Sequence, residues 1–93
     1  MERRATADAV RILTEEWYVY ILKLSNCKYY VGCTSDLIER LNRHQAGYVD
    51  STKYFIPVEL VYFCVFNNKY KAFEFEKYLK SGSGRAFTIK HLV

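Results

Sequence analysis

The sequence predicts an α+β domain in which helices flank a three-stranded antiparallel sheet. Two aromatic and β-branched runs, residues 17–24 and 28–33, stand only three residues apart, as the strands of a β-hairpin do. A third apolar run, residues 58–66, is expected to form the central strand, because it is apolar at both odd and even positions. Two strands before the first helical pattern favour this class over an alternating α/β arrangement.

The turn of the hairpin is expected to contain three residues, 25–27. Side chains alternate between the two faces of a strand, so a two-residue turn would place Tyr20 and Tyr30 on opposite faces of the sheet. A three-residue turn, with Asn26 or Cys27 in the left-handed backbone conformation, places both tyrosines on one face. We favour this longer turn because asparagine tolerates that conformation better than other non-glycine residues.

The first helix is predicted in the stretch TSDLIERLNRHQAG, which carries helix signals at both ends. Thr34, Ser35 and Asp36 are all suitable N-cap residues, and Glu39 stands three positions after the last of them, as in a capping box. Gly47 occupies the position that commonly follows a helix C-terminus. The stretch is therefore expected to form one short, well-delimited helix.

The second helix is predicted over residues 69–80, and a Ser–Gly-rich stretch, residues 81–84, is expected to end it. Residues 85–93 are expected to add a short terminal helix. Residues 1–16 are polar with a few apolar positions and are expected to form an N-terminal arm. A single domain is then expected to cover residues 17–93, a length that suits one small domain.

Two glutamates of the second helix are not equivalent. Ala72 and Leu79 lie four residues before and three residues after Glu76, so Glu76 is expected along the buried stripe of the helix, whereas Glu74 is expected in solvent. A carboxylate on an apolar stripe is unfavourable unless it is paired, hydrogen-bonded or bound to a metal. An ion pair with Lys80, one turn further on, is the alternative to a functional role.

Composition and charge restrict the class of protein. The 93 residues are 51% hydrophobic and 17% aromatic, which suits a small domain with an efficient core. The net charge of +4 is compatible with a polyanionic partner. Cys27, Cys33 and Cys64 lack paired spacing and are expected to be reduced thiols. The longest apolar run has seven residues (60–66) and no signal peptide is recognised, so a cytoplasmic protein without a membrane partner is expected.

Five polar or charged residues would line one cleft if the hairpin and the first two helices converge: Tyr20, Tyr30, Arg40, His44 and Glu76. A cation for phosphate, a carboxylate for Mg²⁺ and hydroxyl or imidazole groups for proton transfer are the parts that phosphodiester hydrolysis needs. The alternative from pattern alone is a solvated basic helix face and tyrosines that belong to the core. No P-loop, dinucleotide-binding glycine motif, zinc-ligand spacing or nucleophile elbow occurs.

In order and spacing, these residues resemble the GIY-YIG nuclease superfamily, specifically its small single-domain bacterial members. YVY (Tyr18–Tyr20) stands at the GIY position and YVG (Tyr30–Gly32) at the YIG position, ten residues apart. SDLIERLNRHQAG is similar to the following helix of the family and carries its arginine, Arg40. AFEFEKYLK is similar to the helix that carries the metal-binding glutamate, which falls at Glu76. The resemblance covers roughly residues 17–85.

The resemblance implies a role for each site residue. Glu76 would be the single protein ligand of a divalent metal, Mg²⁺ or alternatively Mn²⁺, that holds the scissile phosphate. Arg40 would stabilise the charge that develops on this phosphate. One of Tyr20 and Tyr30 would deprotonate or orient the attacking water, and His44 would share the proton transfer.

The implied function is a metal-dependent endonuclease that hydrolyses DNA and selects DNA structure rather than base sequence, with RNA left open as a substrate. The alternatives are a nucleic-acid-binding module with weak or lost cleavage, and a subunit that docks another protein. Lys53, Lys80 and Arg85 are expected to form a basic rim that contacts nucleic-acid phosphates. Three departures from the family are Tyr18 at the glycine of GIY, Cys33 where some relatives carry lysine, and the lack of a late asparagine in residues 85–93. A protein partner and the oligomeric state stay open.

Overall fold

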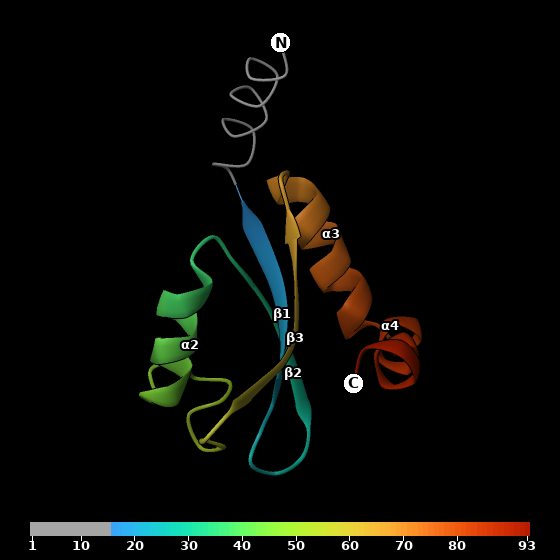
Figure 1. Ribbon diagram of the computed structural model, residues 1–93. Helices are drawn as coiled ribbons and strands as arrows, with labels where there is room; N and C mark the ends of the chain where they lie inside the picture. Colours follow the sequence, from blue (N-terminus) through green and yellow to red (C-terminus); the bar gives the residue numbers. More distant parts are fainter. Residues whose placement is uncertain (1–15) are drawn as a thin grey trace.

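The computed structural model describes residues 16–93, so the predicted N-terminal arm lies outside the described residues except for Glu16. In chain order the elements are β1 (Trp17–Lys23), β2 (Tyr29–Thr34), α2 (Leu37–Gln45), β3 (Glu59–Phe66), α3 (Lys69–Lys80), α4 (Gly82–Phe87) and a π-helical turn η1 (Thr88–Leu92). The strands form an antiparallel sheet in the order β2-β1-β3. Figure 1 shows α2 on one side of this sheet and α3 with α4 on the other. The predicted fold class is confirmed.

The central strand of the sheet is β1, so the prediction of a central third strand was wrong. Val19–Leu22 are four consecutive buried residues of β1, which has a strand on each edge and a helix on each face. β3 lies at an edge, and its Phe63 and Val65 side chains remain 48% and 45% exposed. An apolar run at both odd and even positions therefore did not distinguish a central strand from an edge strand with one open face.

The hairpin turn has the predicted length. Leu22 pairs with Tyr30 across the two strands, which leaves three residues in the loop between the bonded positions Leu24 and Lys28. Cys27 is the residue in the left-handed conformation, with φ 68°. The register that places Tyr20 and Tyr30 on one face is therefore confirmed.

Helix α2 begins and ends where its sequence signals predict. The Glu39 backbone N–H donates to the Asp36 carboxylate at 3.1 Å, so Asp36 is the N-cap. The Glu39 side chain forms an ion pair with Arg43 at 3.8 Å. Gly47, with φ 80°, follows the C-cap and ends the helix.

The alternation of side chains along β1 divides the core into two clusters. On one face, Val19 and Ile21 pack against Ala72 and Leu79 of α3. On the other face, the buried cluster lies toward α2 and the loop before β3, and it consists of Tyr20, Leu22, Leu24, Leu37 and Val58. Tyr20 is thus a residue of β1 whose side chain belongs to the part of the core between the sheet and α2.

Ser81 forms a tight corner between α3 and α4. The Ser81 backbone ends α3, and its hydroxyl accepts a hydrogen bond from the Gly84 N–H at 3.1 Å, so the Ser–Gly stretch begins α4 instead of forming an open turn. Gly84 is buried against the backbone of Tyr78 and Leu79, where a Cβ would overlap main-chain atoms. Close packing of the two helices therefore depends on the absence of a side chain at this position.

The cysteines Cys27, Cys33 and Cys64 are free thiols, as predicted. Between residues 16 and 93, no helix has both the length and the apolar character needed to span a membrane.

The packing of the α3–α4 corner can be tested by making the same glycine-to-alanine substitution at two positions, one crowded and one open. Gly84→Ala is expected to lower the free energy of unfolding by about 1–3 kcal/mol, because the added methyl group must push the two helices apart. Gly82→Ala is the control: outside its chain neighbours and its own helix backbone, no atom lies within 4 Å of the added Cβ, so it should be neutral or stabilising by about 0.5–1 kcal/mol. Urea unfolding measures both, and equal effects would contradict the close packing at Gly84.

Candidate active site

Tyr20 and Tyr30 lie side by side on the face of the sheet that α2 covers. Their ring centroids are 6.5 Å apart. Gly32 is the cross-strand partner of Tyr20, and a Cβ at Gly32 would overlap the Tyr20 phenol. The glycine of the YVG motif therefore leaves the space in which the Tyr20 ring lies across β2.

His44 of α2 binds the Tyr20 hydroxyl. Its Nε2 lies 2.9 Å from the Tyr20 hydroxyl oxygen, and its ring stands edge-on to Tyr30 with a centroid distance of 5.2 Å. Its Nδ1 lies 2.8 Å from the Thr52 hydroxyl oxygen. His44 and Thr52 have no exposed surface. The result is a buried chain of hydrogen bonds from Thr52 through His44 to Tyr20.

Thr52 was not identified from the sequence. It lies in the polar loop between α2 and β3, where no periodic pattern marks a buried position. No signal in the sequence predicts its contact with His44, which stands eight residues earlier on the helix.

Burial keeps both partners of this hydrogen bond neutral. The pKa of His44 is lowered from its usual value by desolvation and then by the nearby charges of Arg40 and Arg43. The pKa of Tyr20 is raised to about 12, mainly by desolvation and next by Tyr30. Arg40 acts in the opposite direction on Tyr20. At neutral pH the site therefore contains a phenol and a neutral imidazole that can accept a proton.

Arg40 brings a positive charge to the same phenol. It lies one turn before His44 on α2, and its guanidinium is close enough to lower the pKa of Tyr20. Its Nε is buried and has no hydrogen-bond partner among residues 16–93. A buried charged donor without an acceptor is uncommon in folded proteins. The guanidinium is thus available to an anionic group that enters the site.

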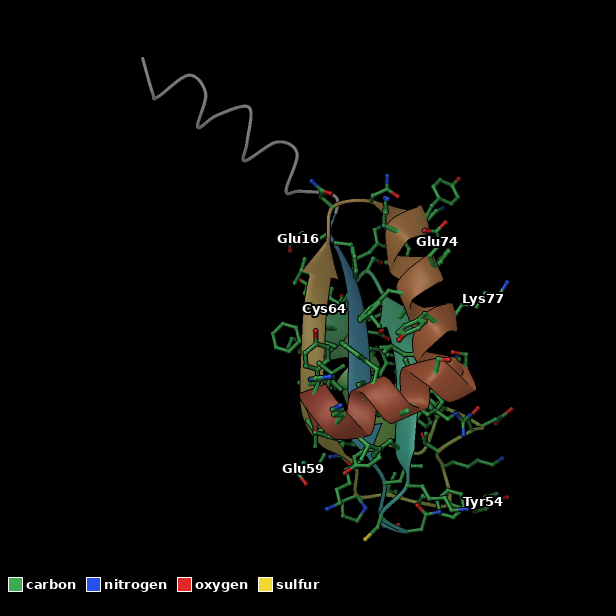
Figure 2. All side chains as sticks on the ribbon, turned by 90° about the vertical axis from the view of Figure 1, so that its right-hand side faces the viewer. Glu16, Tyr54, Glu59, Cys64, Glu74 and Lys77 are labelled. Carbon is green, nitrogen blue, oxygen red and sulfur yellow. The ribbon has the colours of Figure 1, made fainter. Side chains whose placement is uncertain are left out.

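Glu76 brings a negative charge from the opposite layer. Its side chain is 23% exposed, and its carboxylate raises the pKa of both Tyr20 and Cys33, which places it near β2 and the buried phenol. Glu74 is exposed, and Figure 2 shows it on the outer side of α3. The predicted difference in burial between the two glutamates is confirmed. The ion pair named as the alternative also forms, with Glu76 Oε2 3.0 Å from Lys80 Nζ.

Two of the three residues predicted as a basic rim lie at one corner of the fold, and the third belongs to a loop. Lys80 and Arg85 lie at the α3–α4 corner, where Arg85 Nε donates to the Lys80 carbonyl at 3.2 Å. Lys53 belongs to the loop before β3, where it is 3.5 Å from the Asp50 carboxylate and 5.2 Å from the Tyr54 ring centroid. The contact of all three with nucleic acid stays a prediction.

Comparison with known proteins agrees with this arrangement. The GIY-YIG catalytic domain family matches residues 16–90. The chain belongs to the GIY-YIG family. UPF0213 proteins of Streptococcus pyogenes serotypes M5 and M3 are each 34% identical to it over 80 residues, which cover 85% of this chain and 87% of the relative. The solution NMR structure of a UPF0213 protein from Bacillus halodurans is similar to this GIY-YIG domain with a TM-score of 0.53 and 28% identity, over 81% of this chain and 83% of that one.

The carboxylate of this GIY-YIG site fits a metal that binds together with substrate. The part of the chain that the structure describes contains no group of three or more His, Cys, Asp or Glu residues that would hold a metal alone. Mg²⁺ commonly keeps several waters and binds through one or two carboxylates plus substrate phosphates. Glu76, which is half-buried, could supply one such carboxylate, although Lys80 contacts its Oε2. A resident metal held by protein alone is not what this donor set favours.

The buried state of His44 predicts how stability changes with pH. The pKa of His44 is lowered in the folded protein from an ordinary value of 6.5, so the unfolded chain binds a proton first as pH falls. The contribution of neutral His44 to stability is therefore complete above the unfolded pKa and is lost as pH falls from there toward the folded pKa. Urea unfolding between about pH 7.5 and pH 5.5 should show a decline that is smaller in His44→Gln. Equal declines in both proteins would contradict the assignment.

Proposed function

We propose that this GIY-YIG domain is a divalent-metal-dependent endonuclease that hydrolyses phosphodiester bonds in DNA. The observation that carries the proposal is that one buried phenol, Tyr20, bonds to His44 and lies within electrostatic reach of Arg40 and Glu76. A proton acceptor, a cation and a carboxylate that all act on one phenol are the kinds of group that hydrolysis of a phosphodiester requires.

His44 is the proton acceptor of the proposed reaction. A phenol whose pKa is raised to about 12 is a poor source of phenolate by itself, so Tyr20 can take a proton from water only as it passes its own to a neighbour. Neutral His44 Nε2 is that neighbour, at 2.9 Å. In this tautomer the His44 Nδ1–H donates to the Thr52 hydroxyl oxygen. Thr52 thus holds the ring with its basic nitrogen toward Tyr20.

The two tyrosines take different positions relative to solvent. Tyr20 has no exposed surface, whereas Tyr30 is half-buried on the neighbouring edge strand. We assign Tyr30 to orienting the attacking water from the solvent side and Tyr20 to receiving its proton. Both residues thus serve the same proton path from adjacent strands.

Arg40 and Glu76 act on the phosphate. Arg40 stabilises the negative charge that builds up on the phosphate oxygens as water attacks. Glu76 would hold the divalent metal, which when bound would supply Lewis-acid stabilisation of the same phosphate. Lysine and arginine side chains around the site contact the sugar–phosphate backbone and carry no base information directly, which favours selection of DNA structure over sequence.

One observation favours a second candidate, a DNA-binding module with weak cleavage. The Lys80 ammonium group is 3.0 Å from Glu76 Oε2 and competes with a metal for that oxygen. If Lys80 holds Glu76 strongly enough to exclude the metal, the domain would bind DNA through its cations and cut it slowly. The two candidates differ in metal-dependent turnover.

Replacing the site glutamate separates these candidates. Glu76→Gln should lower kcat by at least about 100-fold, because metal stabilisation of the phosphate is worth several kcal/mol and about 2.7 kcal/mol corresponds to that factor. The control Glu74→Gln, an exposed carboxylate on the same helix, should stay within about twofold. Cleavage of a panel of nicked, branched and single-stranded DNA with Mg²⁺ or Mn²⁺ measures both. Loss of activity in the control alone would contradict the assignment to Glu76, and an inactive wild type would favour the binding module.

The role of Thr52 can be measured separately from its part in packing. Thr52→Val keeps the shape of the side chain but removes the oxygen near His44 Nδ1, so kcat should fall about tenfold while KM stays nearly constant. Thr52→Ser should restore most of the activity, because the hydroxyl returns. A purely structural role would instead change both constants or leave both unchanged in folded protein.

A further inference from the structure

A pocket of about 530 Å³ lies next to the proposed active site, where α3 meets α4. Figure 2 shows α4 and η1 crossing in front of the strands at the lower end of α3. The pocket lies between this crossing and the beginning of β2. Residues of β2, α3, α4 and η1 line it together with Lys28, among them Tyr29, Val31, Lys80, Arg85 and Ile89.

The pocket shares residues with the active site. Tyr30 and Lys80 both line it, and Lys80 is the ion-pair partner of Glu76. Lys80 follows Glu76 by one helical turn, a rise of about 6 Å along α3. The pocket therefore lies within reach of the nucleotide next to a phosphate bound at Glu76.

The lining of the pocket combines apolar and aromatic surface with positive charge. Tyr29, Val31 and Ile89 supply apolar surface, and Lys28, Lys80 and Arg85 supply three cations. Within residues 16–93, neither Lys28 nor Arg85 forms an ion pair with a carboxylate.

Two further details concern hydrogen bonding at the pocket. Arg85 is held in place by its Nε bond to the Lys80 carbonyl, so its terminal nitrogens remain available to an anion. Thr88 also lines the pocket, and its buried hydroxyl has no hydrogen-bond partner in the described part of the chain.

We propose that this pocket binds one unpaired nucleotide of the DNA substrate, next to the phosphodiester bond that is cut. The base packs on the apolar and aromatic lining, and its phosphate faces the cations. A base inside a duplex would first have to leave its stack at a cost of a few kcal/mol, whereas an unpaired base enters without that cost. The proposal rests on the proposed endonuclease function and names its substrate class: DNA with an unpaired nucleotide at the cut site, such as a flap.

Binding in EDTA tests the pocket without cleavage. Two DNA ligands of equal length are compared by fluorescence anisotropy: a fully paired duplex and a duplex with a single-stranded flap that carries 2-aminopurine at the junction. The wild type should bind the flap about tenfold more tightly, and 2-aminopurine fluorescence should change on binding. Ile89→Asp should lose this preference, because it places a negative charge in the apolar part of the pocket.

Matched controls separate the pocket from general charge effects. Ile38→Asp adds the same charge at a similarly exposed isoleucine on α2, outside the pocket, and should keep the preference; the two side chains are 61% and 69% exposed at positions 89 and 38. Arg85→Ala should also reduce the preference, whereas Lys77→Ala, an exposed cation of α3 outside the pocket, should not. Circular dichroism confirms folding of each variant.

The possible results distinguish this proposal from the proposed function. A wild type without a preference for the flap, or a preference that survives both Ile89→Asp and Arg85→Ala, would overturn the pocket. Equal losses in Ile89→Asp and Ile38→Asp would overturn it too. Cleavage with Mg²⁺ but no flap preference would support the endonuclease function and contradict the nucleotide-binding role of the pocket. A flap preference that depends on Ile89, in a protein that does not cleave DNA, would support the pocket and contradict the endonuclease function.

Discussion

The hydrogen bond between Tyr20 and His44 is the interaction on which the site depends. It joins the central strand to α2 inside the core, where an unpaired hydroxyl or imidazole would be unfavourable by about 1–3 kcal/mol. Three local features make it possible: a hairpin register that faces Tyr20 toward α2, a glycine at position 32 that leaves room for the phenol, and Thr52 on the far side of the imidazole. The same bond stabilises the fold and provides the proposed proton path.

The two charges of the site come from opposite layers. Arg40 is on α2 and Glu76 is on α3, on the other side of the sheet, yet both act on the charge state of Tyr20. We attribute this to the edge position of β2, because an edge strand leaves its outer side open to both layers. The arrangement keeps a cation and a carboxylate near one phenol without an ion pair between Arg40 and Glu76. Arg40 remains available to a phosphate, whereas Lys80 occupies one oxygen of Glu76.

Lys80 connects the site with the pocket at the α3–α4 corner. Its ammonium group contacts Glu76, its carbonyl accepts a hydrogen bond from Arg85, and its side chain lines the pocket. The corner itself depends on Ser81 and on Gly84, which lets α4 pack against the end of α3. The Ser–Gly stretch, residues 81–84, which the sequence predicts to end a helix, therefore also shapes a candidate binding surface.

The sequence by itself determined the local structure of this protein and pointed to the residues of the candidate site other than Thr52. The start of α2 within residues 34–36, the glycine that follows its end, the bounds of α3 and the three-residue hairpin turn were predictable. Each follows from short-range chemistry, which a few neighbouring residues decide. The motif order YVY, YVG and the two helices was sufficient to recognise the family, and the helical phase of Glu76 relative to Glu74 follows from a period of 3.6 residues.

Only the tertiary structure decided which strand is central and which loop residue supports His44. β1 and β3 are both apolar runs. Their order in the sheet depends on which strands pair with each other across long sequence separations, and no local sequence pattern predicts this pairing. Thr52 meets His44 because a loop without periodicity folds back over α2. Such contacts depend on the packing of whole elements, so residue type and spacing along the chain do not specify them.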